Sequence, residues 1–274
     1  MGHFVIRGAR GTMPACGRYS CGFGGNTTCF SIQTDQGMII VDAGTGISSV
    51  SREIAALHPA PPMTILFTHF HLDHVIGLPC FEPLFRADSR ITIMADPRRP
   101  DGWKETLKTL MGKPYWPIGI GEVDATMTMA DLPIEQGGLD LYGTQVTWFR
   151  VPHPQQCLSY RIRSSDADIV IATDVEYEKS RIAPAFVEFC RHADFLLFDA
   201  QYRPDEYEAH RHWGHSTWEV GAEVARQADV GRLILTHHAP ERTDADIEGI
   251  VTSARQAFPA TDAAAEGMAL SKRA

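Results

Sequence analysis

The stretch Thr68–His74, with the sequence Thr-His-Phe-His-Leu-Asp-His, constrains this 274-residue chain more than any other. It directly follows an apolar run of β type. In an extended chain the side chains at i and i+2 point the same way, so His69 and His71 share one side. Asp73 and His74 can swing in beside them as the chain turns. Three imidazoles and a carboxylate this close together predict a metal site, because neutral imidazole suits zinc and similar transition metals.

The length and the net charge of the chain limit the number of domains and the partners that it can have. The chain is long enough to bury a substantial core as one large domain or two small ones. Its formal net charge of −9 argues against a long polyanion as partner, because phosphate backbones are bound by clustered Lys and Arg. Residues 1–10 carry charge without an apolar stretch, and no apolar run approaches the roughly 20 residues of a membrane helix. We therefore expect a cytoplasmic protein without a secretory signal and without a membrane partner.

Hydrophobic patterning and turn residues predict the order of the elements. Strands are expected at residues 3–8, 29–34, 37–41, 64–68, 91–95, 145–151, 157–163, 168–172, 194–198 and 230–235. Helices are expected at residues 46–57, from about Val75, and at 101–112, 180–192, 216–228 and 243–257. The strands come in two batches, each followed by helices, and no flexible linker separates them. This pattern predicts an α+β fold with a single domain, residues 1–274, in which two sheets pack together with helices outside.

Residues that can bind a metal follow five of the predicted strands: Asp42, the group His69, His71, Asp73 and His74, then His153, Asp174 and His237. Such positions meet at one mouth of a two-sheet sandwich. His69, His71 and His153 can supply a first metal, and Asp73, His74 and His237 a second. Asp174 could bridge both, because a carboxylate has two oxygens. Two metals about 3.5–4 Å apart can lower the pKa of a shared water and stabilise the attacking and leaving oxygens of a displacement.

Three further histidines and one aromatic loop need an assignment. His237 rather than His238 is the expected ligand, because it directly follows the apolar strand. His238 would then point away or lie behind the ligands. We expect His210 and His212 to be surface residues. The loop around Tyr115 and Trp116 either packs over the core or walls the substrate pocket, where it could stack on a planar group.

The ordered set Asp42-Ala43-Gly44, His69-x-His71-x-Asp73-His74, His153, Asp174 and His237 resembles the metallo-β-lactamase superfamily over nearly the whole chain. The resemblance implies a four-layer αβ/βα sandwich of two mixed sheets with outer helices. It also implies two divalent metal ions, with zinc expected and manganese or iron as alternatives. By the same resemblance, Asp42 orients ligands rather than binding a metal itself.

Within this superfamily, the segment Gly214-His215-Ser216-Thr217 is similar to the tRNA 3′-processing endonuclease and cyclic-nucleotide phosphodiesterase branch, as are residues 8–12 and 24–27. The resemblance implies that a hydroxide between the metals attacks phosphorus and that Asp73 orients or deprotonates the water. His215 would stabilise the scissile phosphate and protonate the leaving oxygen. Ser216 could add a phosphate-binding donor at the start of its helix.

Two departures bear on the substrate. The Gly/Pro-rich arm with which the processing endonucleases grip tRNA has no equivalent here, and Pro14–Arg18 replaces their usual N-terminal pattern. Together with the acidic charge, this disfavours tRNA and favours a small-molecule phosphodiester, cyclic or linear. Members of this branch are often dimers, so a homodimer is one option for the assembly.

Two other functions use the same residues. The first is an acyl hydrolase that cleaves a lactam, thioester or lactone, which the Gly214–Thr217 segment disfavours. The second is a non-catalytic metal-binding sensor on an inactive scaffold. An inactive relative usually loses ligands, and none is missing here.

Overall fold

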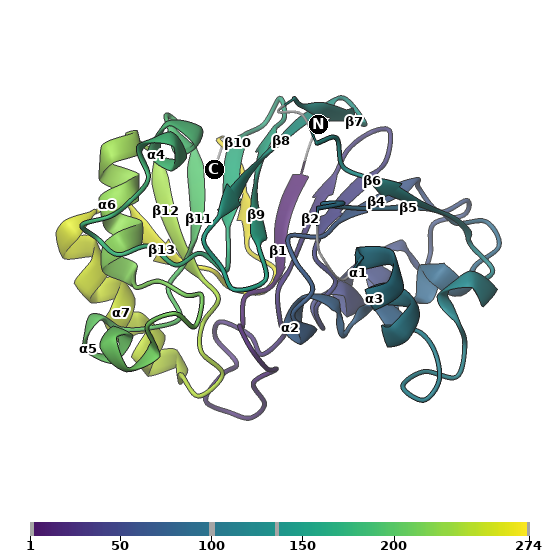
Figure 1. Cartoon of the computed structure of the whole chain (residues 1–274), viewed down its shortest axis with the longest axis horizontal. Coiled ribbons are helices and arrows are strands. Elements are labelled where there is room, and N and C mark those ends of the chain that lie inside the picture. Colours follow the sequence, from purple (N-terminus) through teal and green to yellow (C-terminus); the bar gives the residue numbers. More distant parts are fainter. Residues whose placement is uncertain (1–2, 99–101, 135–136, 273–274) are drawn as a thin grey trace.

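Two mixed sheets of seven strands each form the centre of the computed structural model, which describes residues 3–98, 102–134 and 137–272 (Figure 1). The first sheet has the order β14 (Ala269–Leu270), β1 (His3–Gly8), β2 (Cys29–Gln33), β3 (Met38–Val41), β4 (Met63–Leu66), β5 (Arg90–Ala95) and β6 (Thr126–Asp131). The second has the order β13 (Thr261–Ala263), β12 (Arg232–Thr236), β11 (Phe195–Asp199), β10 (Asp168–Ala172), β9 (Cys157–Arg163), β8 (Thr144–Val151) and β7 (Leu139–Leu141).

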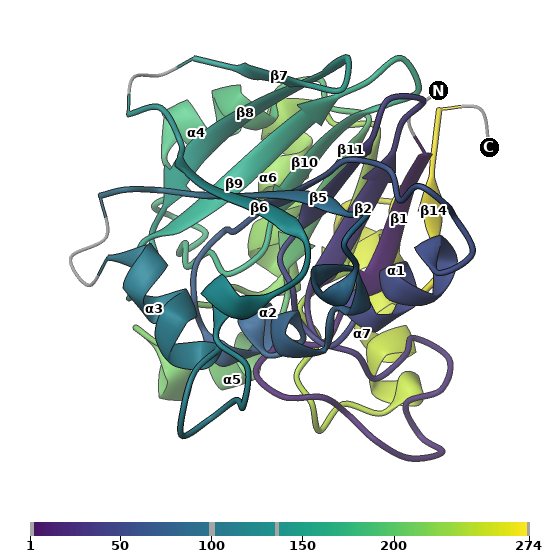
Figure 2. The same cartoon turned by 90° about the vertical axis from the view of Figure 1, so that its right-hand side faces the viewer.

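Helices cover the outer face of each sheet. The helices are α1 (Ile47–Ile54), α2 (Leu72–Val75), α3 (Trp103–Leu110), α4 (Pro184–Cys190), α5 (Pro204–Tyr207), α6 (Trp218–Ala228) and α7 (Asp244–Ala257). In Figure 2, α1, α2 and α3 lie in front of the first sheet, and Figure 1 shows α4, α6 and α7 on the far side of the second. The predicted four-layer αβ/βα sandwich of the α+β class is thereby confirmed.

Alternation along the strands explains these layers. In β3, Ile39 and Val41 enter the core between the two sheets, whereas Met38 and Ile40 pack outward into the cluster that contains residues of α1. All four are fully buried because both faces of the strand are covered. Such central strands appear in the sequence as continuous apolar runs rather than as alternating patterns.

The carboxyl ends of several strands meet at one edge. β3 and β4 are parallel, and β10, β11 and β12 are parallel to one another. β8 runs in the same direction as β10, because both pair antiparallel with β9. The two sheets are tied together beside the histidine motif, where Tyr160 Oη donates to the Phe67 carbonyl (2.8 Å) and the Leu158 amide donates to the Thr68 carbonyl (3.1 Å).

Several boundaries differ from the sequence-based expectations. The helix expected from about Val75 begins at Leu72 inside the motif and ends at Val75. The helices expected at 46–57 and 180–192 are shorter, and the latter begins only at Pro184, a residue favoured in a first helical turn. The helix expected at 101–112 is α3, and residue 101 lies outside the described part. Strands β6, β7, β13 and β14, all at sheet edges, were not predicted. Among the described residues, none of the helices is both long and apolar enough to cross a membrane.

Candidate metal centre and active site

Three imidazole nitrogens converge where the two sheets meet. Nδ1 of His71 lies 2.9 Å from Nε2 of His69 and 3.0 Å from Nε2 of His153. Together with a carboxylate oxygen of Asp174, these atoms form a group that could hold a metal ion. Burial and the neighbouring imidazole of His153 lower the pKa of His71 to about 4. His71 is therefore neutral at pH 7, which is the form in which imidazole binds a metal.

A second group lies beside the first. It comprises Asp73, His74 and His237, whose ligand atoms also lie close enough to share an ion. Asp174 faces both groups: its Oδ1 is 3.5 Å from Nε2 of His69, and its Oδ2 is 3.0 Å from Nε2 of His74 and 3.2 Å from Nε2 of His237. The structure thus brings together all seven residues that the sequence singled out as ligands, with Asp174 between the two groups.

The chemistry of these groups favours bound cations. The carboxylates of Asp73 and Asp174 are buried, and the partners of their ion pairs in the described part of the chain are histidines rather than Lys or Arg. Nε2 of His74 is buried without a hydrogen bond. Burial lowers the pKa of His74, but Asp174, Asp73 and Asp42 more than offset this and raise it well above its ordinary value. Buried carboxylates need compensating positive charge, and a nitrogen and oxygen donor set suits divalent ions.

Asp42, which directly follows β3 and adopts a left-handed conformation (φ 59°), lies behind His74. Its Oδ2 is 2.7 Å from Nδ1 of His74, and the carboxylate also accepts from the backbone amide (2.8 Å) and the hydroxyl (2.7 Å) of Thr68. Because Nδ1 of His74 is held in this way, its Nε2 faces Asp174. A similar contact orients His153, whose Nδ1 lies 2.9 Å from the Gly214 carbonyl.

The loop after β1 also supports the second group, a role that sequence reasoning missed. The backbone amide of Thr12, a residue with φ 64°, donates to Oδ2 of Asp73 at 2.7 Å. Gly11 lies so close to His237 that a methyl group at this position would overlap its imidazole ring. The small residues of this loop therefore allow the backbone to approach Asp73 and His237 directly.

His215 and Asp199 form a pair beside the metal groups. Nδ1 of His215 is 2.8 Å from Oδ2 of Asp199, and the ring of His215 stacks on that of His237 with centroids 4.8 Å apart. Asp199 was not among the predicted site residues. It ends β11, so the rule that drew attention to the other strand ends could also have found it.

Two other candidates lie elsewhere than expected. The hydroxyl of Ser216 is buried, donates to the Val175 carbonyl (2.5 Å) and accepts from the Tyr177 amide (3.1 Å), so it is directed away from the metal groups. His210 is only partly exposed and stacks on Tyr202 at 4.4 Å, unlike the surface residue that we expected.

His212, in contrast, is exposed as expected. His238 is buried, with Nε2 3.0 Å from the Ala264 carbonyl.

A cavity of about 460 Å³ opens onto these groups. Its lining includes His71, Leu72, Asp73, Asp174, Tyr202, His210, Trp213, His215 and His237. Leu72 also lines a neighbouring apolar cavity of about 490 Å³, together with Phe70, Val75, Leu110 and Tyr115. Tyr115 thus walls the adjoining cavity rather than the one at the metal groups, and Trp116 is among the lining residues of neither.

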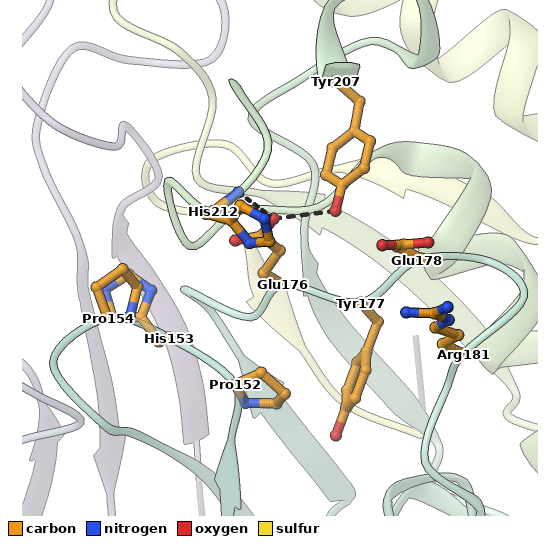
Figure 3. Close-up of a pocket in the computed structure, with 9 residues that line it drawn as sticks. All are labelled: Pro152, His153, Pro154, Glu176, Tyr177, Glu178, Arg181, Tyr207 and His212. Carbon is orange, nitrogen blue, oxygen red and sulfur yellow. Dashed lines mark hydrogen bonds between the residues drawn. The ribbon is translucent and has the colours of Figure 1, made fainter. Parts of the chain in front are cut away.

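A third cavity has His153 among its lining residues (Figure 3). There the carboxylate of Glu176 accepts from Tyr207 Oη (2.9 Å) and from the backbone amides of His212 (2.6 Å) and Gly214 (2.8 Å). Since the Gly214 carbonyl accepts from His153 and Gly214 precedes His215, Glu176 fixes a stretch of backbone that contacts one of these histidines and leads into the other.

Comparisons with known proteins agree with this architecture. Residues 38–238 match the family model described as the beta-lactamase superfamily domain. Ribonuclease Z of Lachnospira eligens is 25% identical in an alignment that covers 96% of this chain and 95% of the relative. The metallo-beta-lactamase fold protein YhfI from Bacillus subtilis has a TM-score of 0.74 and 18% identity, covering 98% of both chains. A diphosphatase from the PhnP family has a TM-score of 0.73 and 19% identity, covering 98% of this chain and 97% of its own.

Proposed function

The chain belongs to the beta-lactamase superfamily, and we propose that within it this protein is a phosphodiesterase that uses two divalent metal ions, with zinc as the expected metal. The sequence-based assignment to the metallo-β-lactamase superfamily is confirmed. The relative is named for a ribonuclease and one structural neighbour is described as a diphosphatase, which agrees with the expected metal-dependent hydrolysis of a bond between phosphorus and oxygen.

The observation that carries this proposal is the position of His215. It lines the same cavity as His71, Asp73, Asp174 and His237, and Asp199 holds its Nδ1. Because a carboxylate can only accept, Nδ1 of His215 carries the proton in this contact. The opposite nitrogen, Nε2, is then free to contact an oxygen of a substrate phosphate, to which it donates when the imidazole carries a proton on both nitrogens.

The ligand residues supply the other half of the chemistry. We assign His69, His71 and His153 to one metal, Asp73, His74 and His237 to the other, and Asp174 to both. Divalent ions held there would lower the pKa of a water and neutralise the charge that develops on the phosphoryl oxygens.

Asp73 can act on that water. Its Oδ2 accepts from the Thr12 amide and faces His74 and His237, whereas its Oδ1 has no protein partner in the part of the chain that the structure describes. We therefore assign to Asp73 the orientation or deprotonation of the attacking water. His215 stabilises the non-bridging oxygens and donates a proton to the leaving oxygen. Phosphate binding is assigned to His215 alone, because the hydroxyl of Ser216 is held by Val175 and Tyr177.

A substrate panel tests the proposal. The zinc-loaded protein and its His215→Ala variant are assayed with bis-(p-nitrophenyl) phosphate, a thioester, a lactone and a precursor tRNA. We expect turnover of the phosphodiester and a large loss of this turnover in His215→Ala, because His215 is the proposed phosphate-binding residue. Acyl substrates do not need such a histidine. Turnover of the thioester or lactone alone would contradict the phosphodiesterase proposal and indicate an acyl hydrolase. Preferred cleavage of the precursor tRNA would indicate that this chain has the activity for which its ribonuclease relative is named.

A further inference from the structure

An exposed tryptophan lies at the mouth of the candidate active site. The side chain of Trp213 is 62% exposed, although it precedes His215 by only two residues and lines the same cavity. Large aromatic side chains are usually buried, so one that is exposed beside a reactive centre is a candidate contact for a ligand.

The surrounding structure holds this side chain in place. The carboxylate of Glu176 accepts from the backbone amides on both sides of Trp213, those of His212 (2.6 Å) and Gly214 (2.8 Å). Figure 3 shows Glu176 beneath His212 and Tyr207. The amide of Trp213 itself donates to the His210 carbonyl at 3.0 Å. The backbone at Trp213 is therefore fixed before any ligand binds, which lowers the entropic cost of binding.

The aromatic surface extends from Trp213 into the cavity. The rings of His210 and Trp213 meet edge to face with centroids 5.0 Å apart, and His210 stacks on Tyr202 at 4.4 Å. Tyr202 in turn contacts His215 edge to face, with centroids 5.8 Å apart. A continuous row of rings thus leads from the solvent to the proposed phosphate site.

The charges of the cavity limit what this row can bind. None of its described lining residues is Lys or Arg, and its charged side chains besides the histidines are Asp73, Asp174 and Glu241. A single phosphate could be neutralised by the metal ions and His215. A second phosphate along the row would meet no cation. The absence of a cation among these described lining residues therefore favours an uncharged group next to the scissile phosphate, and the row of rings favours a planar one.

We propose that Trp213, backed by His210, binds the nucleobase of a mononucleotide-sized substrate by stacking. This inference rests on the proposed function and names its substrate class. A purely apolar group would instead suit the adjoining cavity of Phe70, Val75, Leu110 and Tyr115. Stacking of one base on an aromatic side chain corresponds to an affinity change of about 5- to 150-fold.

Calorimetric titration of the zinc-loaded protein tests the proposal with two probes, adenosine 5′-monophosphate and ribose 5-phosphate, which differ only by the base. We expect wild type to bind the nucleotide about 5- to 150-fold more tightly than the sugar phosphate, and Trp213→Ala to abolish that preference. Trp213→Phe keeps most of it, because a ring is still present. Tyr115→Ala is the matched control, since it removes another exposed aromatic side chain, from the adjoining cavity, and leaves both affinities unchanged.

Two outcomes overturn the proposal. Equal affinity of wild type for the two probes excludes base stacking. An equal loss of affinity for both probes in Trp213→Ala assigns Trp213 a structural role in the loop. Turnover of bis-(p-nitrophenyl) phosphate by wild type is measured in parallel. If turnover is present without a base preference, only this inference fails, whereas absent turnover together with absent binding of either probe removes the proposed function as well.

Discussion

Oδ2 of Asp199 lies 2.8 Å from Nδ1 of His215, and both side chains are buried beside the metal-ligand groups. Asp199 is the last residue of β11, whereas His215 lies in the loop before α6. The contact connects a rigid strand end to a loop residue. It fixes which nitrogen of His215 carries the proton at the carboxylate and which one faces the cavity.

Asp199→Asn replaces the carboxylate that accepts from Nδ1 of His215 by an amide. We expect kcat to fall about 10- to 100-fold for a phosphodiester with an alkoxide leaving group, in line with other residues that orient a functional ligand. The loss is smaller for p-nitrophenolate, which leaves without a proton. Steady-state kinetics with both substrates, together with metal analysis, measures this. An equal loss for both leaving groups would contradict the proton-donor role of His215.

Glu176→Gln weakens the loop that carries His215. Both carboxylate oxygens of Glu176 accept hydrogen bonds, and an amide group can accept with only one of its two ends. One backbone amide of the loop therefore loses its partner. We expect kcat/KM to fall about 10-fold, a change of roughly 1.4 kcal/mol, which is the usual value of one such contact. Metal content stays unchanged.

Glu208→Gln is the matched control for Glu176→Gln. Its side chain is 81% exposed and pairs only with Arg211 among the described residues. Exposed ion pairs contribute little, so we expect kinetics like those of wild type. Comparable losses of kcat/KM in the two variants would show that the removal of a negative charge, rather than weaker hydrogen bonds to the loop, explains the loss in Glu176→Gln.

Gly11→Ala tests the close approach of the loop after β1. A Cβ atom at this position would overlap the ring of His237, whose backbone is fixed at the end of β12. We expect His237 to move, the metal content to fall and activity to be lost. Gly249→Ala is the control: the added Cβ meets nothing within 4 Å in the middle of α7. There, Ala stabilises the helix by about 0.5–1 kcal/mol. Full metal content in Gly11→Ala would contradict the assignment of His237.

Asp168 accepts two hydrogen bonds from the Arg161 guanidinium, at 2.8 and 2.7 Å. Burial opposes ionisation, but Arg161 and Arg163 more than offset it, so the pKa of Asp168 lies below its ordinary value. The pair therefore stabilises the fold above the unfolded-state pKa of about 3.9, and this contribution is lost as the pH falls through the lower folded-state value.

We expect Asp168→Asn to lower the free energy of unfolding by about 2 kcal/mol at pH 7, as for hydrogen bonds to charged groups. The difference from wild type shrinks below about pH 4, where Asp168 of the unfolded chain becomes protonated. Urea unfolding of both proteins at several pH values measures this difference in the free energy of unfolding. Asp229→Asn, at a side chain that is 83% exposed, should change little. A difference that is independent of pH would contradict the ion-pair origin.

The sequence was most informative where chemistry and strand ends coincide. The histidine motif, Asp42, His153, Asp174 and His237 all follow apolar runs, and the parallel arrangement of the strands brings them to one edge. The predicted fold could be inferred because central strands carry long apolar stretches. The edge strand β6 is half-exposed and built from alternating Thr and Met, so it lacks the apolar run that reveals its neighbours.

The residues that sequence reasoning missed act through backbone groups or through contacts between residues that are far apart in the sequence. Glu176 holds amides of a loop 36 and 38 residues away, a contact that no local pattern indicates. Thr12 supports Asp73 with its amide rather than its side chain, so its identity carries no signal. Ser216 was expected to add a phosphate-binding donor at the start of its helix, whereas its hydroxyl donates to the Val175 carbonyl, a contact that the sequence does not indicate.

Metal analysis of the purified protein, paired with turnover of bis-(p-nitrophenyl) phosphate, tests the central proposal most directly. Wild type is compared with Asp174→Ala and His215→Ala. We expect two metal ions per chain in wild type and His215→Ala, fewer in Asp174→Ala, and loss of activity in both variants. The result that would contradict the proposal is a wild-type protein that holds no metal and gains no activity from added zinc or manganese.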